Sequence, residues 1–329
     1  MSEAPLDEFG LIARYFAPLA AAAPGALGLT DDGALIDPEP GRQLVVTTDT
    51  MVAGVHFLPD DPPDQVGRKL LRVNLSDLGA MGAKPLFYTL NTAFGPNVDT
   101  AWIAGFAAGL QADQALFGID LIGGDTVAMP GPTTLTVTAI GSVARGCALK
   151  RRDARVGDAV YVTGTIGDGA LGLAVLRGEL DGLAESSRAA LAERYRLPRP
   201  RFALGMQLVG LAHAAIDVSD GLIADLGHIC ETSGLGAHVE AGRIPLSPGA
   251  QQALILDPSR MESIVGGGDD YELLFTAPES CAAQIEERAR ACDIPVTAIG
   301  RMTAGSGVTV VDNDGRPLAS RVSGYRHFQ

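Results

Sequence analysis

The sequence predicts a two-domain protein that combines an α+β domain with an α/β domain. Its 329 residues are enough to build two hydrophobic cores. Apolar residues recur at helical spacing in some segments and at strand spacing in others, without strict alternation of the two. A polar, basic stretch at residues 145–158, "RGCALKRRDARVGD", separates the two halves. We therefore expect one domain over residues 1–148 and a second over residues 149–329.

Apolar periodicity in the first half predicts three helices and four strands. The helices are expected at residues 6–20 (ending near Pro18), 64–83 and 99–118. The strands are expected at residues 43–52, 85–94, 119–126 and 133–144.

The second half repeats this mixture with a different order of elements. Strands are expected at residues 159–167, 237–241 and 296–302, and helices at 168–178, 187–195 and 281–292. An apolar run at 214–216 leads into a helix that starts near Leu222. The pair Asp314-Gly315 suits the tight turn of a terminal hairpin over 309–318.

The charge of the chain limits its partners. A formal net charge of −14, with only three lysines, excludes a nucleic-acid or anionic membrane surface. This negative charge would also repel a polyanionic ligand unless bound cations reverse the sign of the electrostatic potential at the binding site.

The cysteines and the N-terminus indicate a cytoplasmic protein. The four cysteines form no CxxC pair, so we expect reduced thiols and neither zinc nor a disulfide framework. Acidic residues stand where a signal peptide carries basic ones. Pro18 and Pro24 interrupt the apolar stretch 16–29, so no membrane span is expected there.

One glycine motif is not interpreted as a dinucleotide site. "GDGALG" (167–172) matches GxGxxG, but no second strand follows to present the acidic residue that the fingerprint requires. We expect a tight strand-to-helix turn there and reject NAD binding. The Walker A pattern is also absent, because the sequence contains no Gly-Lys pair.

Aspartates recur at the ends of apolar elements throughout the chain. The candidates are Asp31, Asp32, Asp49, Asp77, Asp125, Asp217, Asp220, Asp269 and Asp270. Any single one could be an ordinary turn or cap residue, and Ser219 or Asp220 could cap the helix in "AAIDVSDGLIADLGH". Gathered in one cleft, however, they would repel each other, and Mg²⁺ bound by carboxylate and hydroxyl oxygens would relieve this repulsion. The residues alone thus predict magnesium-dependent phosphate chemistry.

Seven blocks in this order resemble thiamine-monophosphate kinase, over nearly the whole chain. They are "DDGALI", "VVTTDTMVAGVHF", "VNLSDLGAMGAKP", "LIGGDT", "YVTGTIGDGALGL", "IDVSDGLIADLGHI" and "GGGDDYELLF". The resemblance extends to a superfamily with aminoimidazole ribonucleotide synthetase and selenophosphate synthetase. It implies an N-terminal α+β domain that dimerises through its sheet, and a C-terminal α/β domain that closes the active-site cleft.

The resemblance also implies a reaction and its residues. The reaction is ATP-dependent phosphorylation of thiamine monophosphate to thiamine diphosphate, with several Mg²⁺ ions and no covalent or general-base residue. The implied magnesium ligands are Asp32, Thr47, Thr48, Asp49, Asp77, Asp125, Asp217 and Asp220. The implied nucleotide contacts are Gly124, Asp125, Arg151 and Ser219, and the implied substrate contacts are His56, Asp269 and Tyr325.

The sequence departs from the family pattern at two of these blocks. Thr30 replaces a glycine in "GLTDD", and Asp269 replaces the usual glutamate of "GGED" with a side chain one methylene shorter. His56 alone also fits a half-buried histidine, and Arg151 a solvated linker residue.

Two alternatives remain open from the sequence. One is another ATP-dependent enzyme of the superfamily, with aminoimidazole ribonucleotide synthetase as the nearest rival. Selenophosphate synthetase would need an early cysteine, whereas the first here is Cys147, and hydrogenase-maturation relatives need a cysteine at the C-terminus. The other alternative is a protein that binds magnesium and thiamine phosphates without catalysis.

Overall fold

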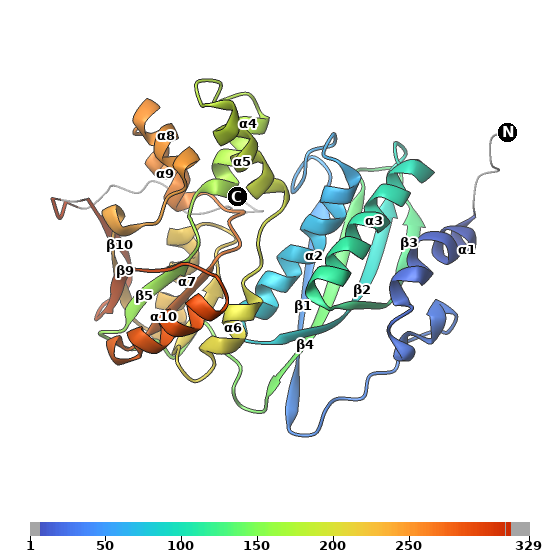
Figure 1. Cartoon of the computed structure of the whole chain (residues 1–329), viewed down its shortest axis with the longest axis horizontal. Helices are drawn as coiled ribbons and strands as arrows, with labels where there is room; N and C mark the ends of the chain where they lie inside the picture. The colour runs from blue at the N-terminus through green and yellow to red at the C-terminus, as the bar shows by residue number, and fades with distance from the viewer. Residues whose placement is uncertain (1–6, 313, 317–329) are drawn as a thin grey trace. The chain divides into compact units, whose positions relative to one another are not determined.

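The structure is a computed structural model that describes residues 7–312 and 314–316. The chain divides into two compact units (Figure 1). The first unit comprises residues 1–78 and 84–145, and the second comprises residues 79–83 and 146–329. Among the described residues, none of the helices combines the length and the apolar character that crossing a bilayer would require.

The first unit is built on a four-stranded sheet with the strand order β1-β4-β2-β3. β4 pairs antiparallel with β1 and β2, and β3 lies parallel to β2. The strands are β1 (Arg42–Val52), β2 (Lys84–Phe94), β3 (Asp120–Ala128) and β4 (Thr134–Ala144). Helices α2 (Pro63–Ala80) and α3 (Thr100–Phe117) cover one face of this sheet (Figure 1). These elements confirm the predictions for residues 43–144.

Glycines and a buried ion pair join α2 to α3. A Cβ on Gly67 would lie 2.5 Å from the carbonyl oxygen of Phe106, so the two helix backbones approach there more closely than a side chain would permit. The carboxylate of Asp113 on α3 is fully buried and accepts hydrogen bonds from Arg68 (2.9 Å) and from Nη2 of Arg72 (3.0 Å) on α2. Buried charges need such partners to offset their desolvation.

The N-terminal segment is helical but irregular. It passes from α1 (Glu8–Leu11) through a π-helical turn η1 (Ile12–Phe16) to a 3₁₀ turn η2 (Ala17–Ala20) and, after a break, a second 3₁₀ segment η3 (Pro24–Leu29). The helix predicted over 6–20 is confirmed over its described part. Pro18 cannot donate a backbone hydrogen bond, which fits the change of helix type around it. Ala20 and Ala26 pack on Ile122 of β3.

The second unit is built on a six-stranded sheet with the order β10-β7-β9-β5-β8-β6. Among the strands that the structure describes in this sheet, β10 and β7 pair parallel and the other neighbouring strands pair antiparallel. The strands are β5 (Ala159–Thr163), β6 (Ala214–Asp217), β7 (Gly236–Glu240), β8 (Leu273–Ala277), β9 (Val296–Thr303) and β10 (Gly307–Val311).

Both faces of this second sheet are covered. Val160 and Val162 of β5 belong to one hydrophobic cluster, whereas Tyr161 between them belongs to another on the opposite face. Because both faces of β5 are buried, its sequence is a continuous apolar run and does not alternate with polar residues. The helices of the unit are α4 (Asp168–Leu176), α5 (Glu185–Arg196), α6 (Phe202–Leu208), α7 (Leu222–Ser233), α8 (Pro248–Leu256), α9 (Arg260–Gly266) and α10 (Ala282–Ala291), with short 3₁₀ turns η4 (Ala241–Arg243) and η5 (Glu279–Cys281).

The predicted terminal turn is present. The N–H of Gly315 donates to the carbonyl oxygen of Asp312 at 3.0 Å, and the N–H of Asp312 donates to that of Arg316 at 2.9 Å. The return strand predicted up to residue 318 lies outside the described residues.

Candidate active site

In the first unit, β1 and α2 bring two predicted magnesium ligands into contact. The hydroxyl of Thr47 on β1 donates a hydrogen bond to the carboxylate of Asp77 on α2. Side chains alternate along a strand, so Asp49 shares the face of Thr47. These three side chains offer only hydroxyl and carboxylate oxygens, which are the donors that hard divalent cations prefer.

Thr48 lies on the other face of the same strand. Its hydroxyl donates to the carbonyl oxygen of Val137 at 3.1 Å and accepts a bond from Thr138, also at 3.1 Å. The structure therefore separates Thr48 from Thr47 and Asp49 by the thickness of the sheet. Its role as a magnesium ligand stays a prediction.

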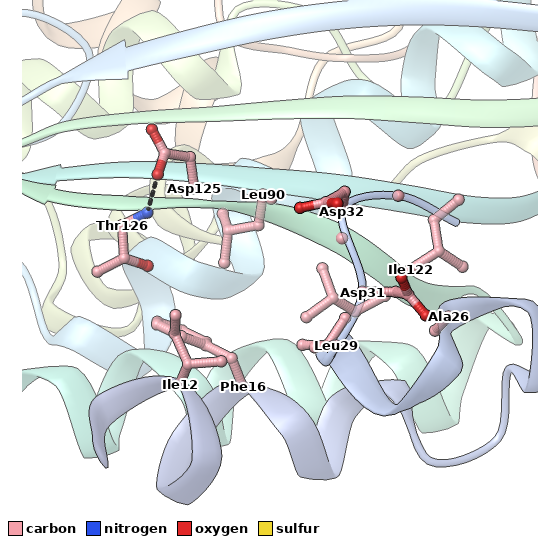
Figure 2. Close-up of a pocket in the computed structure, with 14 residues that line it drawn as sticks. Ile12, Phe16, Ala26, Leu29, Asp31, Asp32, Leu90, Ile122, Asp125 and Thr126 are labelled. Carbon is pink, nitrogen blue, oxygen red and sulfur yellow. Dashed lines mark hydrogen bonds between the residues drawn. The ribbon is translucent and has the colours of Figure 1, made fainter. Parts of the chain in front are cut away.

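Two further predicted ligands line a pocket beside the edge strand β3. The pocket, about 140 Å³ in volume, lies between the N-terminal helical segment and β3, and both Asp32 and Asp125 border it (Figure 2). Ile12 and Phe16 form part of its apolar wall. The carboxylate of Asp125 accepts a hydrogen bond from the N–H of Thr126 at 2.9 Å. The pocket thus combines an apolar surface with exposed acidic groups.

Gly124 shapes the strand beneath this pocket. Its φ is +155°, and a Cβ there would lie 1.8 Å from the carbonyl oxygen of Leu90 on the neighbouring strand. No other residue fits at this position without separating β3 from β2. The residue next to Asp125 must therefore be glycine for a reason of packing, whatever else it contacts.

His56 sits in the turn that follows β1, with a defined ring orientation. Its Nδ1 accepts a hydrogen bond from the N–H of Val52 at 3.0 Å, so in the neutral ring the proton resides on Nε2. The buried ammonium of Lys69 on α2 donates to the carbonyl oxygen of His56 at 3.2 Å. The turn is therefore fixed from two sides.

In the second unit, the loop between β6 and α7 carries Asp217, Ser219 and Asp220. Asp217 ends β6 and is only 2% exposed, while Ser219 and Asp220 are half-buried. Neither Ser219 nor Asp220 caps α7. Gly221 is the N-cap residue, without a side-chain cap bond, and the Asp225 carboxylate accepts from the N–H groups of Asp220 and Gly221, both at 3.0 Å.

Asp225 was missed by the sequence interpretation. Burial, reinforced by the charge of Asp220, raises its pKa to about 7. Ligand atoms of Asp220, Asp225 and His228 lie within 4.8 Å of one another. An aspartate on the apolar face of a predicted helix, four residues after a glycine, was the available signal.

Asp269 lies beside this loop. Its N–H donates to the carbonyl oxygen of Ser219 at 2.9 Å, so a predicted substrate contact and a predicted nucleotide contact are hydrogen-bonded neighbours. The Tyr271 hydroxyl donates to Oδ1 of Asp269 at 3.2 Å. Burial raises the pKa of the adjacent Asp270 to about 8, against the effect of its hydrogen bonds from Gly167 and Gly169.

A buried ion cluster next to Asp269 was also missed. Glu272 has no exposed surface and accepts hydrogen bonds from Arg201 (2.6 Å), Arg194 (2.8 Å) and the hydroxyl of Thr163 (2.6 Å). The block "GGDDYELLF" marked the segment, but nothing in the sequence pairs Glu272 with arginines more than 70 residues away.

The two remaining predicted contacts are Arg151 and Tyr325. Arg151 is exposed in the segment that precedes β5. Tyr325 lies outside the described residues. The structure thus gathers Thr47 with Asp77, Asp32 with Asp125, and Asp269 with Ser219, each within one unit.

The two units match known domains. Residues 30–143 match the AIR synthase related protein, N-terminal domain, and residues 155–313 match the AIR synthase related protein, C-terminal domain. A thiamine-monophosphate kinase of Caulobacter vibrioides is 43% identical over 98% of this chain and 92% of its own. The chain belongs to the thiamine-monophosphate kinase family.

Solved structures of thiamine-monophosphate kinases agree with this assignment. The crystal structure of the kinase from Stenotrophomonas maltophilia has a TM-score of 0.84 and 42% identity over 95% of this chain and 98% of its own. The structure of AaThiL complexed with AMPPCP and TMP has a TM-score of 0.77 and 30% identity over the full length of both chains. The predicted family and fold are therefore confirmed, and the roles of individual site residues stay predictions.

Proposed function

We propose that this chain catalyses the ATP-dependent phosphorylation of thiamine monophosphate to thiamine diphosphate, with release of ADP. The observation that carries the proposal is the similarity, over the full length of both chains, to a kinase complexed with AMPPCP and TMP. AMPPCP is an ATP analogue, so that complex holds an analogue of the phosphate donor together with TMP. The curated relative at 43% identity is itself named for this activity.

The pocket beside β3 supports nucleotide binding. Its apolar wall, which includes Ile12, Phe16 and Leu29, suits a flat purine base, while Gly124 and Asp125 line the same pocket. We assign Gly124 and Asp125 of this surface as nucleotide contacts. Arg151 and Ser219 of the second unit are also proposed nucleotide contacts. An exposed arginine can bind a phosphate through two parallel hydrogen bonds.

The donor set of the acidic residues fits magnesium. The side chains of the proposed ligands offer carboxylate and hydroxyl oxygens and no nitrogen or sulfur. They are Asp32, Thr47, Thr48, Asp49, Asp77, Asp125, Asp217 and Asp220. When bound, Mg²⁺ supplies neutralisation of the phosphate charges. The net charge of −14 increases the need for bound cations, because two polyanionic reactants must approach an acidic protein.

His56, Asp269 and Tyr325 are the proposed contacts for thiamine monophosphate. A neutral imidazole with its proton on Nε2 can donate a hydrogen bond to the substrate. Asp269 supplies a carboxylate that can pair with a cationic or hydrogen-bond-donating part of thiamine.

The chemistry requires no general base. The acceptor is a phosphate monoester whose second pKa is about 6, so it is mostly dianionic at neutral pH. Phosphoryl transfer then depends on positioning and charge neutralisation. We therefore propose direct in-line transfer to the acceptor phosphate, without a phosphoenzyme.

We further propose that residues 1–148 bind ATP and magnesium and that residues 149–329 close the site. We also propose that the protein acts in the cytoplasm and forms a homodimer. The exposed valine Val46 lies on the face of β1 opposite to Asp49, and this face supports dimerisation through the sheet.

A single assay tests the proposed activity. The purified chain is incubated with ATP, Mg²⁺ and thiamine monophosphate, and the products are separated by chromatography. We expect thiamine diphosphate and ADP in equal amounts. Intact ATP binding without either product would contradict the kinase proposal and favour a binding protein.

The course of the transfer can be tested with ATP that is chiral at the γ-phosphorus. A single in-line transfer predicts inversion of configuration. Net retention would instead indicate a phosphoenzyme.

A further inference from the structure

The backbones of three segments of the second unit lie in contact with one another around Asp269. They are the turn that leads into α4 together with the first residues of that helix (residues 164–170), the loop before α7 (residues 218–221) and the segment 266–272, which we term the Asp269 segment. A Cβ on Gly169 would lie 2.4 Å from the carbonyl oxygen of Asp269, and one on Gly268 would lie 2.1 Å from that of Ser219. Gly169 of "GDGALG" is thus explained by close contact with the Asp269 segment, whereas Gly167 approaches Ile264 of α9 and Gly172 approaches Leu191 of α5.

Backbone hydrogen bonds join the Asp269 segment to the loop that carries Ser219. The N–H of Asp269 donates to Ser219 O at 2.9 Å, and the N–H of Tyr271 donates to Val218 O at 2.8 Å. In return, the N–H of Val218 donates to Glu272 O at 2.8 Å. The Asp269 segment is therefore fixed relative to a proposed nucleotide contact.

The backbone of this segment is held in an unfavourable conformation. Asp269 has φ +70° and Tyr271 has φ +51°, a region that residues other than glycine rarely adopt. Such conformations persist only where the surroundings impose them.

Asp270, between these two residues, provides the constraint. Its carboxylate is buried and accepts the N–H groups of Gly167 at 2.7 Å and Gly169 at 2.9 Å. This side chain thereby ties the Asp269 segment to the turn before α4. Tyr271 adds the second constraint, because its hydroxyl donates to Oδ1 of Asp269.

We propose that Asp270 and Tyr271 are positioning residues that fix the carboxylate of Asp269 for recognition of the thiamine substrate. This inference rests on the proposed function. The inference extends the proposed function by assigning specificity for the acceptor substrate to three consecutive residues. Asp270 fixes the backbone conformation at Asp269, and Tyr271 fixes the orientation of the Asp269 side chain. Because Asp269 is shorter than the family glutamate, the direction of its carboxylate must be tightly controlled.

Isosteric variants test each residue. Asp270→Asn keeps the volume but turns NH₂ hydrogens toward one of the two glycine N–H groups. Tyr271→Phe removes only the hydroxyl. We expect each variant to raise the KM for thiamine monophosphate about ten-fold, which is the size of effect expected from the loss of one hydrogen bond. The KM for ATP should change less than about two-fold, because the nucleotide contacts remain.

Asp158→Asn is the matched control. Asp158 is also buried in the second unit, accepts a backbone N–H (from Arg155, 2.9 Å) and contacts His213. It precedes β5, whereas the Gly167 turn follows that strand. The control should lower thermal stability without raising the KM for thiamine monophosphate. An equal rise in the control, or equal rises for both substrates in the test variants, would overturn the inference.

A double-mutant cycle separates positioning from direct contact. If Tyr271 acts through Asp269, Tyr271→Phe has no further effect on the KM in an Asp269→Ala background, where no acceptor for the hydroxyl remains. Additive effects would show that Tyr271 acts independently and would overturn its assignment.

Amide hydrogen exchange provides a readout that does not depend on activity. In the ligand-free protein, Asp270→Asn should accelerate exchange in a peptide covering 266–272 by about ten-fold, because the constraint on the backbone is lost. Asp158→Asn should leave this peptide unchanged. Unchanged exchange in Asp270→Asn overturns the positioning role, whereas failure of the wild type to phosphorylate thiamine monophosphate overturns the proposed function alone.

Discussion

Asp217 is the residue on which the acidic site imposes the greatest cost. Among the proposed metal ligands it alone is nearly withdrawn from solvent, and it stands at the end of a buried strand with Asp220 three residues away. A buried carboxylate loses its hydration, and hydrogen bonds or a nearby cation must offset this cost. In the proposed function, bound Mg²⁺ contributes to that offset.

Asp217→Asn should therefore abolish turnover while the fold is retained. We expect kcat to fall by at least about 100-fold, as when a transition-state charge loses its stabilisation. Thermal unfolding of the metal-free variant should occur at the wild-type temperature or above. If the variant unfolds instead, and its folded fraction keeps wild-type specific activity, Asp217 is a structural residue.

Asp270 makes the stability of the second unit depend on pH. Burial raises its pKa from 3.8 to about 8. The native state thus keeps a proton that the unfolded state releases above about pH 4. The contribution of this group is complete below that pH and is lost as the pH rises to about 8, by at most about 1.4 kcal/mol per pH unit.

Urea unfolding at pH 5.5, 6.5 and 7.5 measures this dependence. The wild type should lose stability more steeply with pH than Asp270→Asn, which has no proton to release. Parallel pH profiles for the two proteins would show that Asp270 does not titrate in this range.

For individual residues, the sequence predicted which side chains are candidates for the site, but it did not predict which side chains contact one another. The repeated aspartates were visible because each ends an apolar element. The bond between Thr47 and Asp77, by contrast, depends on packing α2 against β1, and the cluster of Glu272 with Arg194 and Arg201 depends on chain segments far apart in sequence. Local patterns carry no information on such partners.

The elements themselves followed largely from hydrophobic periodicity. The long strands and helices of the first unit were predicted to within a few residues, because apolar residues recur in them at strand or helix spacing. The strand predicted over 159–167 ends at Thr163, since Gly164 and Gly167 adopt positive φ values. Helices α6, α8 and α9 were not predicted, because each has nine residues or fewer and a weak apolar pattern.

The contact between α2 and α3 depends on Asp113. Replacing it with alanine leaves the guanidinium groups of Arg68 and Arg72 without their buried carboxylate. Asp113→Ala should lower the free energy of unfolding by about 3–5 kcal/mol. Urea denaturation followed by circular dichroism measures this change.

Asp99→Ala is the control for this prediction. Asp99 caps the same helix at an exposed position, with its side chain accepting the N–H of Trp102 at 2.8 Å. Its loss should cost about 1 kcal/mol. Equal losses in the two variants would mean that the Asp113 pair contributes no more than an exposed cap.

At the scale of the whole molecule, the proposed homodimer can be tested at exposed apolar side chains of the first sheet. Val46 is 62% exposed in the middle of β1, and Val127 on β3 is 48% exposed. We propose that these two side chains contribute to the dimer interface. The sequence implied this dimer only through the family resemblance.

Val46→Asp should convert the proposed dimer to monomers in sedimentation velocity experiments. The aspartate would bury an unpaired charge in the interface, which costs several kcal/mol. Ile255→Asp, at an exposed position of α8 in the other unit, should leave the dimer intact. A monomeric wild type, or dissociation by both variants, would contradict dimerisation through this sheet.

The central claim is that the chain transfers the γ-phosphate of ATP directly to the phosphate of thiamine monophosphate. The most direct measurement is a ³¹P NMR time course of the protein with both compounds and Mg²⁺, alongside Asp217→Asn. The account predicts that the thiamine diphosphate and ADP signals grow in equal amounts with the wild type and are absent with the variant. ADP and free phosphate without thiamine diphosphate, or equal turnover by the variant, would contradict it.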